Sequence, residues 1–257
     1  MKTSSPFAVL MYHSLSDGRW PDPFAPKFTI PLSRFSEHIR FIKDAGYVLG
    51  DFADVNLRVR EGRGFPGQYC VISLDDGHKS GLEMAEVLNA HGTPATFFLT
   101  RDYCLRRADF LNAADIRLLQ SAGFDLGTHG TSHRPLAGRA MDEVRTELAD
   151  SKKWLEDLLG RAVDSMSLPG GSANREVIRL AWETGYDLVG TSRERMNRLV
   201  SLPSTVDRFV VQHGYGVRHI ARMLHGSLSY VAPRGVRALL VWLPKKLLRT
   251  AERRRAD

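Results

Sequence analysis

The stretch that decides the fold is "YCVISLDDG", residues 69–77. Its first six residues form an apolar run with β-branched side chains, as expected for a buried strand. Two adjacent carboxylates, Asp75 and Asp76, follow at the end of this run and precede a glycine. Neighbouring negative charges at such a point either cap and turn the chain or serve a site that requires both of them.

Other segments share the character of this strand, being short, apolar and bounded by Gly, Pro or Asp. They are Phe7–Tyr12, Ala95–Leu99, Phe124–Gly127, Asp164–Leu168, Asp187–Gly190 and Arg208–Val211.

Amphipathic helical patterns separate the candidate strands. They occupy residues 32–47, 80–92, 141–160 and 174–186, and the clearest of them ends at Gly160. Strands that alternate with such helices predict parallel strands joined by right-handed crossovers. About seven strands in a chain of this length favour a distorted (β/α)7 barrel-like α/β domain, with an open doubly wound sheet as the alternative.

Composition sets wider limits on the protein. The chain has 257 residues, 43% of them hydrophobic, which suits one large domain or two small ones with a sizeable core. Its two cysteines, Cys70 and Cys104, have no paired spacing, so neither a thiolate zinc site nor a disulfide framework is indicated. No secretion signal or membrane-spanning run is visible, and we therefore expect a cytoplasmic protein.

The net charge of +7 is concentrated in one place. Residues 231–257 hold eight basic and two acidic side chains, which supply six of these seven charges. We therefore divide the chain into a main domain, residues 1–230, and a basic amphipathic tail, residues 231–257. The tail suits either a helix packed on the domain or a peripheral contact with the inner membrane face. No nucleic-acid-binding motif accompanies the charge, so nucleic acid is not an expected partner.

Polar side chains follow several strands at the same end, where α/β folds place their functional groups. Asp76, His129 and His133 together form a two-histidine, one-carboxylate set that suits a divalent metal with open positions. Alone, a DDG turn or an HxxxH spacing is more often structural. Their combination on neighbouring strand ends favours a metal site.

The motifs resemble those of the polysaccharide deacetylase family, the NodB-homology domain of carbohydrate esterase family 4. "SLDDG" (73–77) is similar to its first motif, "HGTSHRPL" (129–136) to its second, and "SLPGG" (167–171) to its third. "TPATFFLT" (93–100) resembles its second strand. The motifs follow the family order, and the resemblance runs from about Phe7 to Arg208.

The resemblance implies a role for each matching residue. Asp76, His129 and His133 would hold one divalent ion, with Zn²⁺ as the first expectation and Co²⁺ or Ni²⁺ as alternatives. Asp75 would be the general base. Pro169 and Gly170 would line the substrate and oxyanion position, with the Gly170 backbone N–H as the donor.

Two features depart from the usual family pattern. The C-terminal strand that carries the acid histidine is missing, but "VLMYHS" (9–14) has its character. The chain thus resembles the circularly permuted branch, similar to the poly-N-acetylglucosamine deacetylases, with His13 as general acid and His213 as its competitor. The third motif lacks the arginine that orients the base, because Ser167 occupies its place, and this leaves open how Asp75 is held.

The expected activity is removal of N-acetyl groups from an N-acetylated amino sugar. The substrate would be a polysaccharide, an oligosaccharide or a lipid- or nucleotide-linked precursor. A deformylase or other linear-amide hydrolase, and a metal-free carbohydrate-binding domain, are the alternatives. Trp20, Phe24 and Phe65 are candidate exposed aromatics for stacking on sugar rings, and His78 is a further candidate for lining the site.

Overall fold

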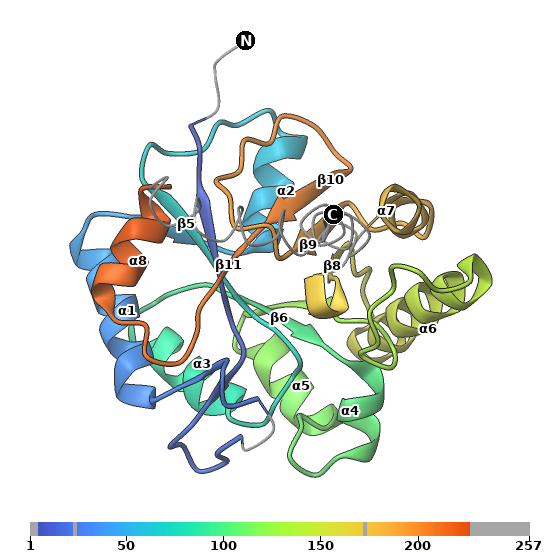
Figure 1. Cartoon of the computed structure of the whole chain (residues 1–257), viewed down its shortest axis with the longest axis horizontal. Coiled ribbons are helices and arrows are strands. Elements are labelled where there is room, and N and C mark those ends of the chain that lie inside the picture. Colours follow the sequence, from blue (N-terminus) through green and yellow to red (C-terminus); the bar gives the residue numbers. More distant parts are fainter. Residues whose placement is uncertain (1–4, 23–24, 172–173, 227–257) are drawn as a thin grey trace, which may run out of the picture.

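The computed structural model describes residues 5–22, 25–171 and 174–226 as a parallel sheet nearly closed into a barrel, with helices outside it (Figure 1). The strands are β1 Ala8–Tyr12, β2 Ser14–Leu15, β3 Thr29–Ile30, β4 Val48–Gly50, β5 Tyr69–Leu74, β6 Thr96–Leu99, β7 Asp125–Thr128, β8 Ser165–Ser167, β9 Leu188–Thr191, β10 Ser204–Asp207 and β11 Phe209–Val210. The helices are α1 Leu32–Asp44, α2 Phe52–Arg60, α3 Gly81–Ala90, α4 Arg101–Arg106, α5 Ala113–Ser121, α6 Met141–Leu159, α7 Arg175–Glu183 and α8 Val217–Leu224, with a single 3-10 turn, η1, at Pro169–Gly171.

The main sheet runs in the order β10-β9-β8-β7-β6-β5-β1-β11, and β4 pairs with the first half of β5. Its ladders are parallel, which confirms the barrel-like α/β prediction. The seven predicted strands are present as β1, β5, β6, β7, β8, β9 and β11. The pattern did not reveal β4, which has only three residues, or β10, whose sequence "STVD" is mostly polar.

One chain segment connects the two edges of the sheet. β10 pairs with β9, and β11 pairs with β1 at the opposite edge, in the register Leu10↔Phe209. Arg208 is the only residue between these two strands. The barrel is therefore brought close to closure at Arg208, whose side chain is fully buried.

Side chains alternate between the inside and the outside of the barrel, as strand geometry requires. Leu10 and Ile72 belong to the large cluster that packs under the helices. Val9, Val71 and Phe98 belong to a second, smaller cluster on the other face, inside the barrel. Because the side-chain period is two, the residues that continue this inner row at the carboxyl ends of the strands face the same interior space.

Phe65 closes one end of the inner cluster. Its ring stacks on Phe7 with centroids 4.4 Å apart, and its side chain is 6% exposed. The expectation that Phe65 is an exposed aromatic is therefore wrong, because the Phe65 side chain packs in the inner hydrophobic cluster. Trp20 is half-buried, with Arg19 and Lys79 over its ring, and Phe24 lies outside the described residues.

Gly127 in β7 offers a test of packing between strands. A Cβ atom there would lie 2.5 Å from the Phe98 ring and 2.8 Å from the Ser165 carbonyl oxygen. We expect Gly127→Ala to lower the free energy of unfolding by about 1–3 kcal/mol through overpacking. Urea unfolding measures this. Gly64→Ala, whose methyl group meets nothing within 4 Å, is the control, and equal midpoints for the two variants would contradict the prediction.

Candidate functional site

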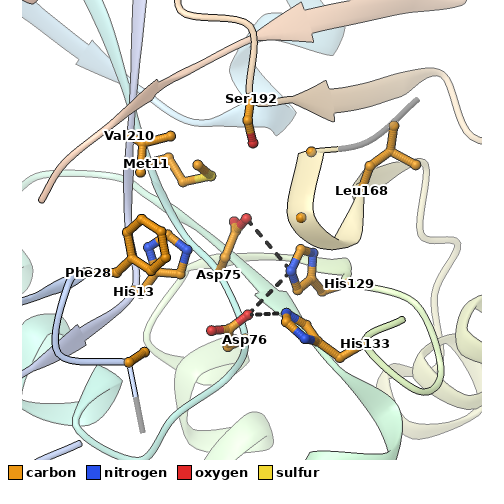
Figure 2. A pocket seen from close by; sticks show the side chains of 13 residues that line it. Met11, His13, Phe28, Asp75, Asp76, His129, His133, Leu168, Ser192 and Val210 are labelled. Atoms are coloured by element: carbon orange, nitrogen blue, oxygen red, sulfur yellow. Dashed lines mark ion pairs between the residues drawn. The ribbon is translucent and has the colours of Figure 1, made fainter. Parts of the chain in front are cut away.

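The carboxyl ends of the strands surround a cavity of about 290 Å³, which is lined by most of the site residues predicted from the sequence (Figure 2). Asp75 and Asp76 follow β5, His129 follows β7, and His13 follows β1. The remaining lining residues are Met11, Ala25, Phe28, His133, Leu168, Gly170, Gly171, Ser192 and Val210. The fold thus brings together side chains that are more than 100 residues apart in the sequence.

Asp76, His129 and His133 converge on one point. Asp76 Oδ1 lies 2.9 Å from His133 Nε2 and 3.3 Å from His129 Nε2. The ligand atoms that the three residues offer all lie within 4.8 Å of one another, and no other such group occurs within the ranges that the structure describes.

The chemistry of this donor set fits a divalent cation. His129 Nδ1 donates to the Ser167 carbonyl oxygen at 2.9 Å, which turns Nε2 toward Asp76. Such a bond to the remote nitrogen is the usual way in which a metal-ligating imidazole is oriented. Asp76 Oδ1 is buried without a well-aligned hydrogen bond, although both imidazoles lie close to it. The three groups therefore suit a positive charge placed between them.

The pKa shifts of Asp76 and His129 agree with a site for a cation. Burial alone would raise the pKa of Asp76, but the adjacent imidazoles outweigh this effect and hold the pKa well below its usual value. Burial would lower the pKa of His129, but the Asp75 and Asp76 carboxylates reverse the effect and raise it. The site thus stabilises an ionised carboxylate and attracts a positive charge.

Two of these three residues have strained backbones. Asp76 has φ 76° and His133 has φ 61°, and they are the only non-glycine residues with positive φ among those described. Such conformations cost of order 1–3 kcal/mol each and persist only where the surroundings impose them. Strain at both ends of the Asp76–His133 contact is what a preformed site would produce.

Asp75 points the other way, into the barrel, where it meets Arg208. The guanidinium donates to both carboxylate oxygens, from Nη1 at 2.7 Å and from Nη2 at 2.9 Å. Ser167 accepts from Arg208 Nη2 at 2.6 Å and donates to Asp75 Oδ2 at 2.7 Å. Arg208 Nε donates to the Thr191 carbonyl oxygen at 3.1 Å. Burial would raise the pKa of Asp75, but Arg208 and His129 outweigh it and lower the pKa.

This contact answers the question that the missing motif arginine left open. The sequence alone does not connect Arg208 with Asp75, because 133 residues separate them. The available signal was Arg208 in the short stretch "VDRFVV", residues 206–211, where Asp207 and Arg208 are the charged residues beside apolar ones. An arginine in such a stretch can be buried only where its charge is paired.

His13 lies beside the carboxylates, and its ring stacks on Phe28 with centroids 4.8 Å apart. Its Nδ1 is buried without a hydrogen-bond partner. Burial lowers the pKa of His13, against the opposing effect of Asp76 and Asp75. The competing residue His213 lies away from the cavity, where its Nδ1 donates to the Thr29 carbonyl oxygen at 3.2 Å.

Only part of the third motif lines the cavity. Gly170 and Gly171 line it, with Leu168 beside them. The ring of Pro169 instead lies against Gly130, where an added Cβ would meet it at 3.2 Å. Pro169 is not among the residues that line this cavity, and its ring supports the loop that carries the histidines. Its predicted role beside the substrate stays a prediction.

His78 does not line the cavity either. It is 2% exposed, and its Nδ1 pairs with the Ser80 hydroxyl at 2.9 Å, next to the start of α3. The basic tail, residues 231–257, lies outside the described residues, so membrane contact through it stays a prediction, as does a cytoplasmic location. None of the helices within residues 5–22, 25–171 and 174–226 combines the length and hydropathy needed to cross a bilayer.

Comparison with known proteins extends these observations. The family model described as Polysaccharide deacetylase matches residues 62–189, which contain Asp75, Asp76, His129 and His133 but neither His13 nor Arg208. The chain is 27% identical over 192 residues to YxkH of Bacillus subtilis (strain 168), which is named provisionally as a polysaccharide deacetylase. That match covers 73% of this chain and 66% of YxkH, slightly less than two thirds of its length.

Solved structures share the fold. The deacetylase PplD of Streptococcus pyogenes, solved in complex with acetate, has a TM-score of 0.74 at 20% identity, covering 86% of this chain and 99% of that one. A de-N-acetylase from Aggregatibacter actinomycetemcomitans has a TM-score of 0.75 at 18% identity, covering 86% and 100%. IcaB from Ammonifex degensii has a TM-score of 0.71 at 20% identity, covering 81% and 93%.

The Arg208–Asp75 pair can be tested in the metal-free protein. Arg208→Met leaves a buried carboxylate without its cation, and we expect the free energy of unfolding to fall by about 3–5 kcal/mol. The double variant Asp75→Asn/Arg208→Met removes the charge as well and should be less destabilised than the single variant. Urea unfolding at neutral pH measures both. A double variant as unstable as Arg208→Met would show that charge pairing is not what Arg208 contributes.

Proposed function

Since the chain belongs to the polysaccharide deacetylase family, whose members deacetylate acetylated sugar polymers, we propose that it is a metal-dependent hydrolase that removes N-acetyl groups from an N-acetylated amino sugar. One observation carries this proposal: two neighbouring carboxylates have separate partners. Asp76 meets two imidazoles, while Asp75 is held by a buried arginine. The substrate is a polysaccharide, an oligosaccharide or a carrier-linked precursor.

Asp76, His129 and His133 would hold the ion, with Zn²⁺ as the first choice and Co²⁺ or Ni²⁺ as alternatives. When bound, a divalent ion in such a site acidifies a water molecule and polarises a carbonyl group. The His129 contact with the Ser167 carbonyl oxygen keeps the imidazole in the orientation that this binding needs.

Asp75 is the general base. The lowered pKa keeps its carboxylate ionised at neutral pH, so that it can accept the proton of the attacking water. Arg208 and Ser167 occupy both carboxylate oxygens and fix their orientation. Asp75 also lies beside the ligand set, with its Oδ2 3.9 Å from His129 Nε2.

His13 is the general acid that protonates the leaving amine. It lines the same cavity as Asp75, and its ring orientation is set by stacking on Phe28. The backbone N–H of Gly170, at the mouth of the cavity, is the proposed donor to the oxygen that develops negative charge.

Metal content tests the ligand assignment. We expect purified protein loaded with Zn²⁺ to hold about one ion per chain, and His133→Ala to lose it, because two remaining ligands bind far more weakly than three. Elemental analysis after gel filtration measures both proteins. Arg134→Ala, at the exposed neighbouring position, is the control and should keep its metal. A wild type without metal would overturn the proposed function.

Acetate release tests the chemistry. N-acetylglucosamine oligomers are offered to the zinc-loaded wild type, to Asp75→Asn and to His13→Ala. Each variant should keep its metal and lose about 10²–10⁴-fold in rate, the usual contribution of a general base or acid. His213→Ala should retain wild-type activity. A metal-loaded wild type that releases no acetate would leave the site in place and point to another linear amide, for which formamide substrates are the next assay.

A further inference from the structure

A carboxylate from α6 holds the loop that carries the second histidine ligand. Glu147 Oε2 accepts from the backbone N–H groups of Thr131 and Ser132, each at 2.9 Å. Its Oε1 accepts from the Ser132 hydroxyl. The side chain of Glu147 is only 11% exposed. One buried carboxylate thus receives three hydrogen bonds from the two residues that directly precede His133.

The same loop is held from its other side. Arg101 and Asp102, at the start of α4, donate their backbone N–H groups to the carbonyl oxygens of Gly130 and Thr131, at 3.2 and 2.9 Å. The Thr131 hydroxyl donates to the backbone oxygen of Glu147 at 3.1 Å. The loop is therefore fixed between α4 and α6 before any ion binds.

This clamp ends where the backbone is strained. His133 follows Ser132 directly and has φ 61°, in the left-handed region that non-glycine residues rarely adopt. Its ring lies against Tyr103 of α4, with centroids 5.3 Å apart, and faces Asp76. A strained residue persists only where its surroundings over-determine it. The three bonds to Glu147 hold the two residues that directly precede His133 in the chain.

The two backbone N–H groups can only donate, so they require an acceptor oxygen. The Ser132 hydroxyl can accept as well as donate, so a glutamine could keep all three contacts by turning its NH₂ group toward this hydroxyl. The variant Glu147→Leu instead removes every acceptor and leaves both backbone N–H groups without a partner. Glu143, one turn earlier on α6, is 57% exposed and pairs with Arg139 Nε. Arg139 Nη1 also lies 3.9 Å from Glu147 Oε1, but it is Glu147 that accepts hydrogen bonds from the loop.

We propose that Glu147 is a positioning residue that presets His133 for metal binding, an inference that rests on the proposed metal site. It touches neither the ion nor the substrate. Its contribution is to hold the Thr131–Ser132 backbone so that the imidazole stands opposite Asp76 and His129 in the metal-free protein. Loss of the clamp lets His133 leave the strained conformation, so that binding must restore it.

Cobalt binding tests the inference without reference to catalysis. Metal-free wild type, Glu147→Leu and the matched control Glu143→Leu are titrated with Co²⁺, whose visible absorption reports the geometry of its ligands. We expect Glu147→Leu to bind about 10–100-fold more weakly, the usual effect of losing a group that orients a ligand. Its cobalt spectrum should differ from that of wild type, while Glu143→Leu should match wild type in both measurements.

The outcomes separate this inference from the proposed function. Equal affinity and an identical spectrum for Glu147→Leu and wild type would overturn the positioning role alone, even if the variant melted at a lower temperature. A wild type that binds no cobalt would overturn the metal site and the inference with it. Weaker binding with an altered spectrum, seen only in the Glu147 variant, would support the role.

Ser132→Ala provides the test if Glu147→Leu does not fold. Ser132→Ala removes only the hydroxyl contact with Glu147 and leaves both backbone bonds in place. We expect a smaller loss of cobalt affinity, of about 2–10-fold, with a normal melting temperature of the metal-free protein. Cobalt binding by Ser132→Ala equal to that of wild type would count against the clamp.

Discussion

The ion pair between Arg208 and Asp75 is the interaction on which the rest of the structure depends. Arg208 lies between β10 and β11, where the chain passes from one edge of the sheet to the other, and its side chain is fully buried. Contacts with Thr191, Ser167 and Asp75 tie β9, β8 and β5 to it. A buried cation is tolerated only when paired, so one set of contacts both closes the barrel and orients the carboxylate.

The two adjacent carboxylates serve different partners because the chain turns between them. Asp75 continues the inward row of β5 and meets the guanidinium. Asp76 adopts a positive φ, which directs its carboxylate to His129 and His133 instead. A cation therefore balances one charge from inside the barrel, and the two imidazoles lie against the other. The backbone strain at Asp76 is the structural condition for this separation.

The sequence predicted seven strands of the main sheet, the helices α1, α3, α6 and α7, and most of the candidate site, because each of these follows from local periodicity or from short motifs. The helices α2, α4, α5 and α8 were not predicted. His129 and His133 could be paired with Asp76 because strand ends meet at one edge of a parallel sheet. Arg208 and Glu147 could not be assigned in this way. Each side chain forms hydrogen bonds with a residue in another part of the fold. The local sequence pattern around Arg208 or Glu147 does not indicate which residue that is. Phe65 was misjudged for the same reason, since only packing on Phe7 shows that it is buried.

By itself the sequence determined the α/β class, the order of the motifs and the residue types available for chemistry at the strand ends. Only the tertiary structure decided which histidine lies beside the carboxylates, since His13 and His213 both end apolar runs. It also decided that an arginine from the last strands replaces the one missing from the third motif. The physical reason is that periodicity encodes which face of an element is buried, whereas pairing of distant charges depends on how the closed sheet brings its strands together.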